Sequence, residues 1–477
     1  MKLAVALLLT ASVVSAADLT ARLDTLVAAP AGTRASIGIH VVKVASGETL
    51  YAHDADRLYL PASNFKLFTA AVALARLGPA YRFETRVIRE PSGDLVLVGS
   101  GDPSLSGRVY PYSMEAREAS PLAAIEALAE HLVSTAQLRR VDGNIVGDDQ
   151  RYPWAPYPAS WTEDDIVRSY GAPVSALTLN DNVITIVARP GARPGDLARV
   201  SVNPRVEYFT VDNRVTTTAN GTSSVRFERV PGTRQVLLTG SLSLPSGGAE
   251  ETMAVDDPAL FAAQALYDAL VRRGVAIHGR PMARHRMVAG KAPVVQGEVL
   301  ASRTSPPLSE LLQAFIKVSQ NLHAELALRE VGFARRGDGS LDAGLGELLA
   351  FLSEARISPV EWRSEDGSGL ARNDQVTPAA ITRLLRYMET SPNGVVWHGL
   401  LPIGGQDGTL DHRLCCTSDG SRIRAKTGTL SRSIALSGYA DSRSNGKLAF
   451  SILVNNFAAP ASEVRDWVDK IALALIE

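Results

Sequence analysis

The chain has 477 residues, of which 45% are hydrophobic and 21% charged, and its formal net charge at pH 7 is -1. This is the balance of an ordinary globular protein, and the length favours two or three domains. Because a net charge near zero gives no overall basic field, we expect no nucleic-acid partner. The two cysteines, Cys415 and Cys416, are adjacent, which argues against a framework of structural disulfides and gives a metal site little support. We have no physical account of this pair.

Residues 1–16 have the pattern of a secretory signal peptide. Lys2 precedes an apolar run, and the small residues Ser15, Ala16 and Ala17 suit cleavage after position 16 or 17. The run is too short to span ~30 Å of hydrocarbon, and no later stretch reaches ~18 continuous apolar residues. We therefore expect a mature chain with no integral membrane segment. It would lie in the periplasm, or outside the cell if the organism lacks a periplasm.

The predicted elements fall into three groups along the chain. The first group is a helix over 18–29, strands over 36–44 and 49–53, and a helix from Pro61 to Leu77. Residues 83–296 alternate short strands with Gly and Pro turns, and one helix-like stretch, 121–136, interrupts them. The last group has helices over 308–332, 341–355 and 378–390, strands over 423–430, 434–441 and 447–455, and a helix over 461–476.

The first and last groups together predict one α+β domain. It would comprise residues 17–82 plus 297–477, split by residues 83–296 as a mostly β insertion of two subdomains. Asn445-Gly446, between the last two strands, is a strong hairpin signal.

Lysine is rare in this chain, since only eight of the 49 basic residues are Lys. Arg cannot lose its proton at physiological pH, whereas a Lys can do so where its surroundings lower its pKa. A Lys that remains in such a background is therefore a candidate for chemistry. We expect four of them to be solvated instead, namely Lys43, Lys291, Lys447 and Lys470.

Ser63-Asn64-Phe65-Lys66 lies in the first turn of the helix predicted after Pro61. The i to i+3 spacing puts the Ser hydroxyl and the Lys amine on one face, and a helix N-terminus disfavours a protonated Lys. A neutral Lys66 could then take the Ser63 proton, which activates a weak nucleophile. Alone the signal is weak, because Ser444–Lys447 is a second match. We attribute that copy to chance, since it lies on the predicted hairpin turn.

A second motif, Ser319-Gln320-Asn321, follows an apolar helical run. Its hydroxyl and amide groups are suited to proton relay and substrate binding. Alone, the same residues could equally form a helix end on the surface.

A third motif, Lys426-Thr427-Gly428-Thr429, begins a predicted strand whose edge could pair with an extended peptide. Gly428 removes a side chain where a backbone must approach closely. Lys426 and the hydroxyls of Thr427 and Thr429 could receive a carboxylate. Alone, this motif could also be a solvated turn.

In this order the three motifs match the S-x-x-K, S-D-N and K-T-G set of penicillin-binding proteins and class A β-lactamases, with Gln320 in place of Asp. The long interval from Ser63 to Ser319 argues against a compact β-lactamase. It resembles the D-Ala-D-Ala carboxypeptidase/endopeptidase family typified by penicillin-binding protein 4 (class C low-molecular-mass penicillin-binding proteins). Further segments carry this resemblance over nearly the whole mature chain: 99–103, 147–149, 172–177, 366–372 and 401–410. Ala371 stands where the family usually has Ser.

The resemblance implies a serine β-lactamase/transpeptidase-like fold and a serine D,D-peptidase that acts on peptidoglycan stem peptides. Ser63 would be the acylated nucleophile and Lys66 the base. Ser319 and Asn321 would relay the proton and hold the substrate. The segment from Lys426 through Thr427 and Gly428 to Thr429 would bind the terminal carboxylate. The oxyanion hole would be the N–H groups of Ser63 and Thr429. No cofactor or metal is implied, and β-lactams would acylate the same Ser.

Other interpretations have less support. A Ser-His-Asp hydrolase lacks a G-x-S-x-G elbow, and a histidine such as His323 is more often structural. Gly99-Ser100-Gly101 lacks the third Gly of a dinucleotide-binding fingerprint. The main alternative is a non-catalytic peptidoglycan-binding or sensor protein on the same scaffold, which would be expected to lose Ser63, Lys66 or Lys426. The carboxypeptidase and endopeptidase balance, the stem-peptide preference, homo-oligomer formation and the role of the insertion stay open.

Overall fold

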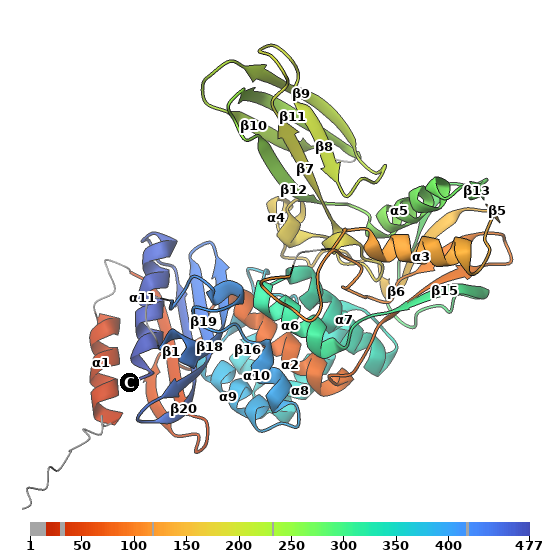
Figure 1. Ribbon diagram of the computed structural model, residues 1–477. Coiled ribbons are helices and arrows are strands. Elements are labelled where there is room, and N and C mark those ends of the chain that lie inside the picture. Colours follow the sequence, from red (N-terminus) through yellow and green to blue (C-terminus); the bar gives the residue numbers. More distant parts are fainter. Residues whose placement is uncertain (1–15, 29–33, 117–118, 231–232, 416–418) are drawn as a thin grey trace, which may run out of the picture. The chain divides into compact units, whose positions relative to one another are not determined.

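The computed structural model describes residues 16–28, 34–116, 119–230, 233–415 and 419–477. The chain divides into two compact units (Figure 1). Of the described residues, unit 1 comprises those within 16–64, 355–363 and 375–477, and unit 2 those within 65–354 and 364–374. These boundaries differ from the predicted ones, which follow residues 82 and 296. The predicted domain division stays a prediction. The predicted signal peptide lies outside the described residues, apart from Ala16 at the start of the first helix.

Unit 1 is built on a five-stranded antiparallel sheet with the strand order β18-β19-β20-β1-β2. Its strands are β1 (Ser36–Lys43), β2 (Thr49–His53), β18 (Ile423–Leu430), β19 (Ser433–Ser442) and β20 (Gly446–Asn455). The predicted strands match these bounds to within about one residue. The hairpin at Asn445-Gly446 is confirmed, because Ser442 pairs with Gly446 and Gly446 has a φ of 70°.

Helices cover both faces of this sheet. They are α1 (Ala16–Ala28), α9 (Pro378–Glu389), α10 (Gly394–Leu400) and α11 (Ala461–Ala474). Ile37 and Ile39 of β1 pack into a core with α1 and α11, which lie together beside the sheet in Figure 1. His40 points to the other face, where its Nδ1 lies 2.6 Å from Thr382 Oγ1 on α9. Because successive strand residues point to opposite faces, the two helical layers enclose the sheet.

The helical part of unit 2 contains α2 (Lys66–Leu77), α6 (Leu308–Val318), α7 (Asn321–Arg336) and α8 (Leu341–Glu354). The helical stretch expected over 308–332 is therefore two helices. The first helix ends at Ser319, whose left-handed φ of 61° and ψ of 36° cannot continue a right-handed helix. The other three helices pack against α2.

The rest of unit 2 contains a mixed five-stranded sheet in the order β14-β6-β4-β3-β15. Its strands are β3 (Glu84–Arg89), β4 (Leu95–Val98), β6 (Ile145–Pro153), β14 (Pro281–Arg286) and β15 (Glu298–Thr304), and α3 (Ala123–Ser134) and α5 (Pro258–Arg272) pack beside it. The expectation of a single helical stretch in this region is wrong, because it missed α5. The cues were present: Asp257 caps α5 by accepting the Leu260 N–H, and Pro258 occupies its first position.

Two three-stranded sheets, β10-β11-β9 and β12-β7-β8, pack against each other in unit 2 (Figure 1). Their strands are β7 (Val183–Arg189), β8 (Arg199–Asn203), β9 (Thr210–Thr218), β10 (Ser224–Arg229), β11 (Gln235–Ser243) and β12 (Ala249–Ala254). The short elements are α4 (Glu163–Ile166), β5 (Arg140–Val141), β13 (Ala276–Ile277), β16 (Trp362–Arg363) and β17 (Gln375–Val376). Within the described part of the chain, no helix is both long and apolar enough to cross a membrane.

Candidate active site

Ser63 lies in η1 (Ala62–Phe65), a 3₁₀ turn that ends where α2 begins at Lys66. The expectation that Ser63 occupies the first turn of the α-helix is therefore wrong. The reason is Ala62, whose left-handed φ of 48° delays entry into the helix. Residues i and i+3 still share one face, because a 3₁₀ helix has three residues per turn. Of the described residues 61–74, Ser63 alone is not buried.

The turn that carries Ser63 packs against β18 inside unit 1. The Asn64 side chain donates a hydrogen bond from Nδ2 to the Lys426 carbonyl over 3.1 Å. A Cβ on Gly428 would lie 2.7 Å from the Pro61 carbonyl oxygen. Gly428 is therefore needed for close approach, as expected, and the approaching backbone is the protein's own. Alternation along the strand puts Lys426 on the same face as Gly428, toward the residues that flank Ser63.

The other residues of this motif are held differently. Lys426 is fully buried, and its Nζ donates to the Thr427 carbonyl over 2.7 Å. The Thr427 hydroxyl donates to Thr409 Oγ1 over 2.8 Å, whereas Thr429 is exposed. Because β18 is an edge strand of its sheet, its backbone at Thr429 suits pairing with an extended ligand.

Lys66 lies in unit 2 as the first residue of α2, and its side chain is fully buried. Its Nζ donates to Asn321 Oδ1 over 2.6 Å and to the Ser368 carbonyl over 2.7 Å. Both acceptors are neutral oxygens. The structure therefore joins Lys66 and Asn321, two residues of separate motifs, by a direct hydrogen bond that the sequence analysis did not anticipate.

Burial lowers the pKa of Lys66 to about 8, although the nearby Asp366, Glu325 and Asp374 act to raise it. Burial also raises the pKa of Glu325 to about 7, so this carboxyl carries only part of its negative charge near neutral pH. A lysine with a pKa near 8 exists partly as the neutral amine at physiological pH, as a general base requires. The α2 N-terminus disfavours the protonated form further.

A tight loop around Asp366 presents the Ser368 carbonyl to Lys66. The Asp366 carboxylate accepts hydrogen bonds from the Ser368, Gly369 and Ala371 N–H groups over 2.7–3.0 Å. It also accepts from the Ser368 hydroxyl and from Trp161 Nε1. The sequence singled out this segment but could assign Ser368 no role. What Lys66 contacts is a main-chain carbonyl, and the side chain gives no signal for that.

Ser319 and Asn321 flank the junction between α6 and α7, and both are half-buried. The Asn321 amide uses both ends, since Oδ1 accepts from Lys66 and Nδ2 donates to the Tyr170 carbonyl over 2.8 Å. Tyr170 was not expected at the site. Tyr170 contacts Asn321 through its main-chain carbonyl, and the residue type does not reveal such a contact. A cavity of about 400 Å3 adjoins Ser319, Gln320, Asn321 and Tyr170 within unit 2.

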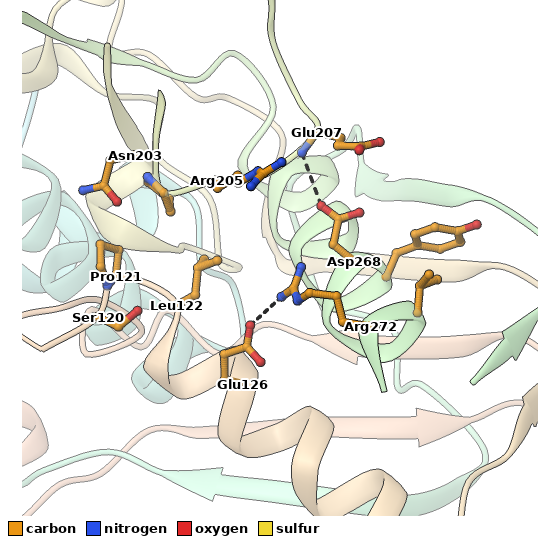
Figure 2. A pocket seen from close by; sticks show the side chains of 12 residues that line it. Ser120, Pro121, Leu122, Glu126, Asn203, Arg205, Glu207, Asp268 and Arg272 are labelled. Carbon is orange, nitrogen blue, oxygen red and sulfur yellow. Dashed lines mark hydrogen bonds and ion pairs between the residues drawn. The ribbon is translucent and has the colours of Figure 1, made fainter. Parts of the chain in front are cut away.

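A second cavity, of about 660 Å3, contains none of the predicted site residues (Figure 2). It lies between α3, α5 and the segment after β8. Within its lining Arg272 pairs with Glu126 over 2.5 Å, and Asp268 accepts the Glu207 N–H over 3.2 Å.

The remaining candidate residues are accounted for as follows. Lys291, Lys447 and Lys470 are exposed as expected, and Lys43 is half-buried beside Glu48. His323 is buried, and its Nε2 lies 2.8 Å from Asp181, which fits a structural role. Cys415 is exposed, and Cys416 lies outside the described residues. Among the described residues no group of three or more His, Cys, Asp and Glu could hold a metal ion.

Comparisons with known proteins agree on one family. The sequence profile of the D-Ala-D-Ala carboxypeptidase 3 (S13) family matches residues 19–475. A D-alanyl-D-alanine carboxypeptidase of Actinomadura sp. (strain R39) is 34% identical over 96% of this chain and 85% of its own length. The crystal structure of penicillin-binding protein 4 (dacB) from Haemophilus influenzae has a TM-score of 0.79 at 21% identity, and the match covers 95% of this chain and 97% of that chain. The same Haemophilus protein complexed with a β-lactam gives 0.76 at 19% identity, over 95% and 99% of the two chains. These matches confirm the expected α+β transpeptidase-like fold.

Proposed function

The chain belongs to the D-Ala-D-Ala carboxypeptidase 3 (S13) family and is a serine-type hydrolase of that class, and we propose that Ser63 is its acylated nucleophile. The observation that carries this proposal is Lys66, a buried amine three residues after Ser63 whose pKa is lowered to about 8. Ser63 itself is the residue of its turn that solvent reaches. Activation of a serine hydroxyl requires a base such as a partly neutral amine, which Lys66 can supply.

In the proposed acylation, Lys66 Nζ takes the Ser63 hydroxyl proton while Oγ attacks the carbonyl carbon of the penultimate D-Ala. The C–N bond to the terminal D-Ala then breaks, and its nitrogen receives a proton relayed through Ser319. Asn321 holds Lys66 Nζ through its amide oxygen, which keeps the lone pair directed and adds no charge to the amine. The N–H groups of Ser63 and Thr429 would stabilise the tetrahedral oxyanion.

The K-T-G segment is proposed to bind the substrate carboxylate. Lys426 supplies the positive charge and Thr429 a hydroxyl donor, and the Thr427 hydroxyl would join them by exchanging its hydrogen bond to Thr409 for one to the substrate. Gly428 lets β18 lie against the turn that carries Ser63. Water then attacks the ester carbonyl, so the acyl group leaves Ser63 as a free carboxylic acid and the hydroxyl is restored.

We propose peptidoglycan stem peptides that end in D-Ala-D-Ala as substrates, with D-alanyl cross-links as a second substrate that forms the same acyl-enzyme and releases the amine of the neighbouring stem peptide instead of D-Ala. β-Lactams would acylate Ser63 because their strained amide mimics the D-Ala-D-Ala bond. The Haemophilus relative solved with a β-lactam supports this proposal. D-Ala release from a stem pentapeptide, measured beside cleavage of a cross-linked dimer, would give the balance between the two activities.

Intact-mass spectrometry of the mature protein with a β-lactam tests the nucleophile. The wild type and a Ser444→Ala variant, which removes the second S-x-x-K match, should each gain one drug-sized adduct. A Ser63→Ala variant should gain none. If the folded wild type gains no adduct with any drug, the acyl-enzyme is rejected and the non-catalytic peptidoglycan-binding protein becomes the better explanation.

We also propose that the enzyme acts outside the cytoplasm, in the periplasm or at the cell exterior. The support is the basic start, apolar run and small-residue site in residues 1–17. N-terminal sequencing of the protein recovered from the export compartment should begin at Ala17 or Asp18. Recovery of the intact chain from the cytoplasm would contradict this.

A further inference from the structure

Three successive residues before β7 adopt the left-handed conformation. Asn180, Asp181 and Asn182 have φ values of 51°, 53° and 57°. Left-handed backbone is unfavourable for side chains other than glycine, and Asn and Asp tolerate it best. Such strain persists only where surrounding contacts hold it, and it gathers at functional sites.

Hydrogen bonds hold this turn on both sides of Asp181. The Asn180 N–H donates to the Leu105 carbonyl over 2.8 Å. Asn182 Oδ1 accepts from the Leu179 N–H and the Thr178 hydroxyl, and its Nδ2 donates to the Pro173 carbonyl over 2.8 Å. With both neighbours fixed, the side chain of Asp181 has a fixed direction.

Asp181 points at the junction between α6 and α7, where Ser319 and Asn321 lie. Its Oδ2 accepts from Gln320 Nε2 over 3.0 Å and from Arg108 Nε over 2.8 Å. Its Oδ1 lies 2.8 Å from His323 Nε2, in the first turn of α7. Burial alone would raise the pKa of Asp181, but His323 and Arg108 hold it well below its usual range, so the carboxylate stays charged.

Gln320 connects this carboxylate to the S-x-N motif. Its Nε2 donates to Asp181, while its Oε1 accepts the Leu322 N–H over 3.1 Å and caps α7. Ser319 on one side of Gln320 is the left-handed end of α6, and Asn321 on the other side accepts from Lys66. One side chain therefore fixes the short segment that separates two helices and carries both predicted catalytic groups.

We propose that Asp181 is a positioning residue for catalysis, which sets the Ser319–Asn321 segment through Gln320 and His323. This inference rests on the proposed function and extends that function by naming the carboxylate that positions the S-x-N motif. It also explains why this chain has Gln at position 320, where the general pattern has Asp. A carboxylate there would face the Asp181 carboxylate, whereas the amide supplies a donor.

The test compares single and paired substitutions that exchange donor and acceptor. Asp181→Asn and Gln320→Glu should each lower the rate constant for acylation by a fluorescent penicillin by about 10- to 100-fold, since small displacements of catalytic groups have effects of this size. The double variant restores one acceptor and one donor with their direction reversed. It should recover at least about 10-fold over either single variant. With a peptide ending in D-Ala-D-Ala, kcat should change by a larger factor than KM does.

Asp149→Asn is the matched control, because Asp149 is a buried carboxylate that, like Asp181, lies against a histidine, here His285 over 2.9 Å. It should lower the melting temperature but leave the acylation rate within about twofold of the wild type. The inference is overturned if Asp181→Asn slows acylation no more than Asp149→Asn does, or if the double variant recovers nothing. If Asp181→Asn does not fold, Gln320→Glu and the double variant decide. A wild type that no penicillin acylates would overturn the proposed function itself, and this inference with it.

Discussion

Two basic side chains in unit 2, Lys66 and His285, are both removed from solvent to a large extent, and their pKa values move in opposite directions. Lys66 donates to an amide oxygen and a main-chain carbonyl, and burial lowers its pKa to about 8. Burial alone would also lower the pKa of His285, but its bonds to Asp149 and Asp257 raise it to about 10. One site releases a proton near neutral pH and the other retains it.

The difference lies in the charge of the hydrogen-bond acceptors. Carboxylates are present at both sites, but at Lys66 they act from a distance and Asp366 is engaged by N–H, O–H and indole donors. At His285 the acceptors are themselves carboxylates, at 2.9 and 3.4 Å. A directly bonded negative charge favours the protonated form, whereas a neutral acceptor leaves desolvation to dominate. Neutral contacts thus distinguish Lys66, the proposed base, from a structural ion pair such as that of His285.

The largest effect should come from Lys66→Arg, which keeps the positive charge but cannot lose its proton. We expect acylation by a β-lactam to fall by roughly 10²- to 10⁴-fold, the range that general-base catalysis contributes. Stopped-flow or quenched-flow measurement of the acyl-enzyme gives the rate. Lys447→Arg, in the second S-x-x-K match, should behave as the wild type does. A loss below about threefold in Lys66→Arg would exclude Lys66 as the base.

Asn321→Asp should convert the surroundings of Lys66 toward those of His285. A carboxylate at 2.6 Å from Nζ would raise the pKa of Lys66 by about one to three units. The acylation rate would then fall by about 10- to 1,000-fold at pH 7, as the neutral fraction of Lys66 falls, and recover as the pH is raised. The decisive quantity is the midpoint of the pH–rate profile. A lower rate with an unmoved midpoint would mean that only the Tyr170 contact was lost. That result would contradict the explanation that the charge of the acceptor sets the pKa of Lys66.

His285 should make stability depend on pH in a defined window. Its pKa is raised above the unfolded value of 6.5, so its contribution is full below pH 6.5 and is lost as the pH rises toward 10. Because the side chain is 20% exposed, we expect about 1–2 kcal/mol. Urea unfolding of wild type and His285→Gln at pH 6.5 and 9.5 measures this. The difference between the two proteins should shrink at the higher pH, and a constant difference would contradict the ion pair.

Asp257→Asn should have the smallest effect of the four. Asn keeps the cap on α5, where Oδ1 accepts the Leu260 N–H over 2.9 Å, and removes only the charge that faces His285 at 3.4 Å. We expect a loss of about 0.5 kcal/mol at pH 6.5 and a smaller loss at pH 9.5, where part of His285 is already neutral. The check is the same urea titration, with Asp257→Ala as the variant that also removes the cap. Equal losses in Asn and Ala variants would mean that the cap contributes nothing.

Much of the fold could be predicted because the patterns are local. The strand 423–430, the hairpin at Asn445-Gly446 and the separation of a sheet from later helices all follow from periodicity and turn chemistry. The three motifs were identified by residue type and order, and the family comparison confirms the class they indicated. Long-range pairing, such as that of β1 with β20, could only be inferred from the resemblance.

What the sequence did not reveal depends on backbone geometry. The Ser368 and Tyr170 carbonyls bond Lys66 and Asn321, but any residue type has a carbonyl. The 3₁₀ turn at Ser63 follows from the left-handed φ at Ala62, a residue with no preference for it. The carboxylate of Asp181 reaches Gln320 from a segment far away in the chain. These features require coordinates, because no residue pattern encodes them.

The central sheet of unit 1 can form only after nearly the whole chain has been synthesised. β1 pairs along its whole length with β20, the last strand of the chain, and β20 in turn pairs with β19 beside β18. A ribosome delivers the first strand tens of seconds before the last one at typical elongation rates. Until then the partner edge of β1 stays unfilled, and the strand that carries Lys426 and Gly428 does not exist. A chain that stopped before residue 423 would lack both the pairing partner of β1 and the strand that carries Lys426 and Gly428.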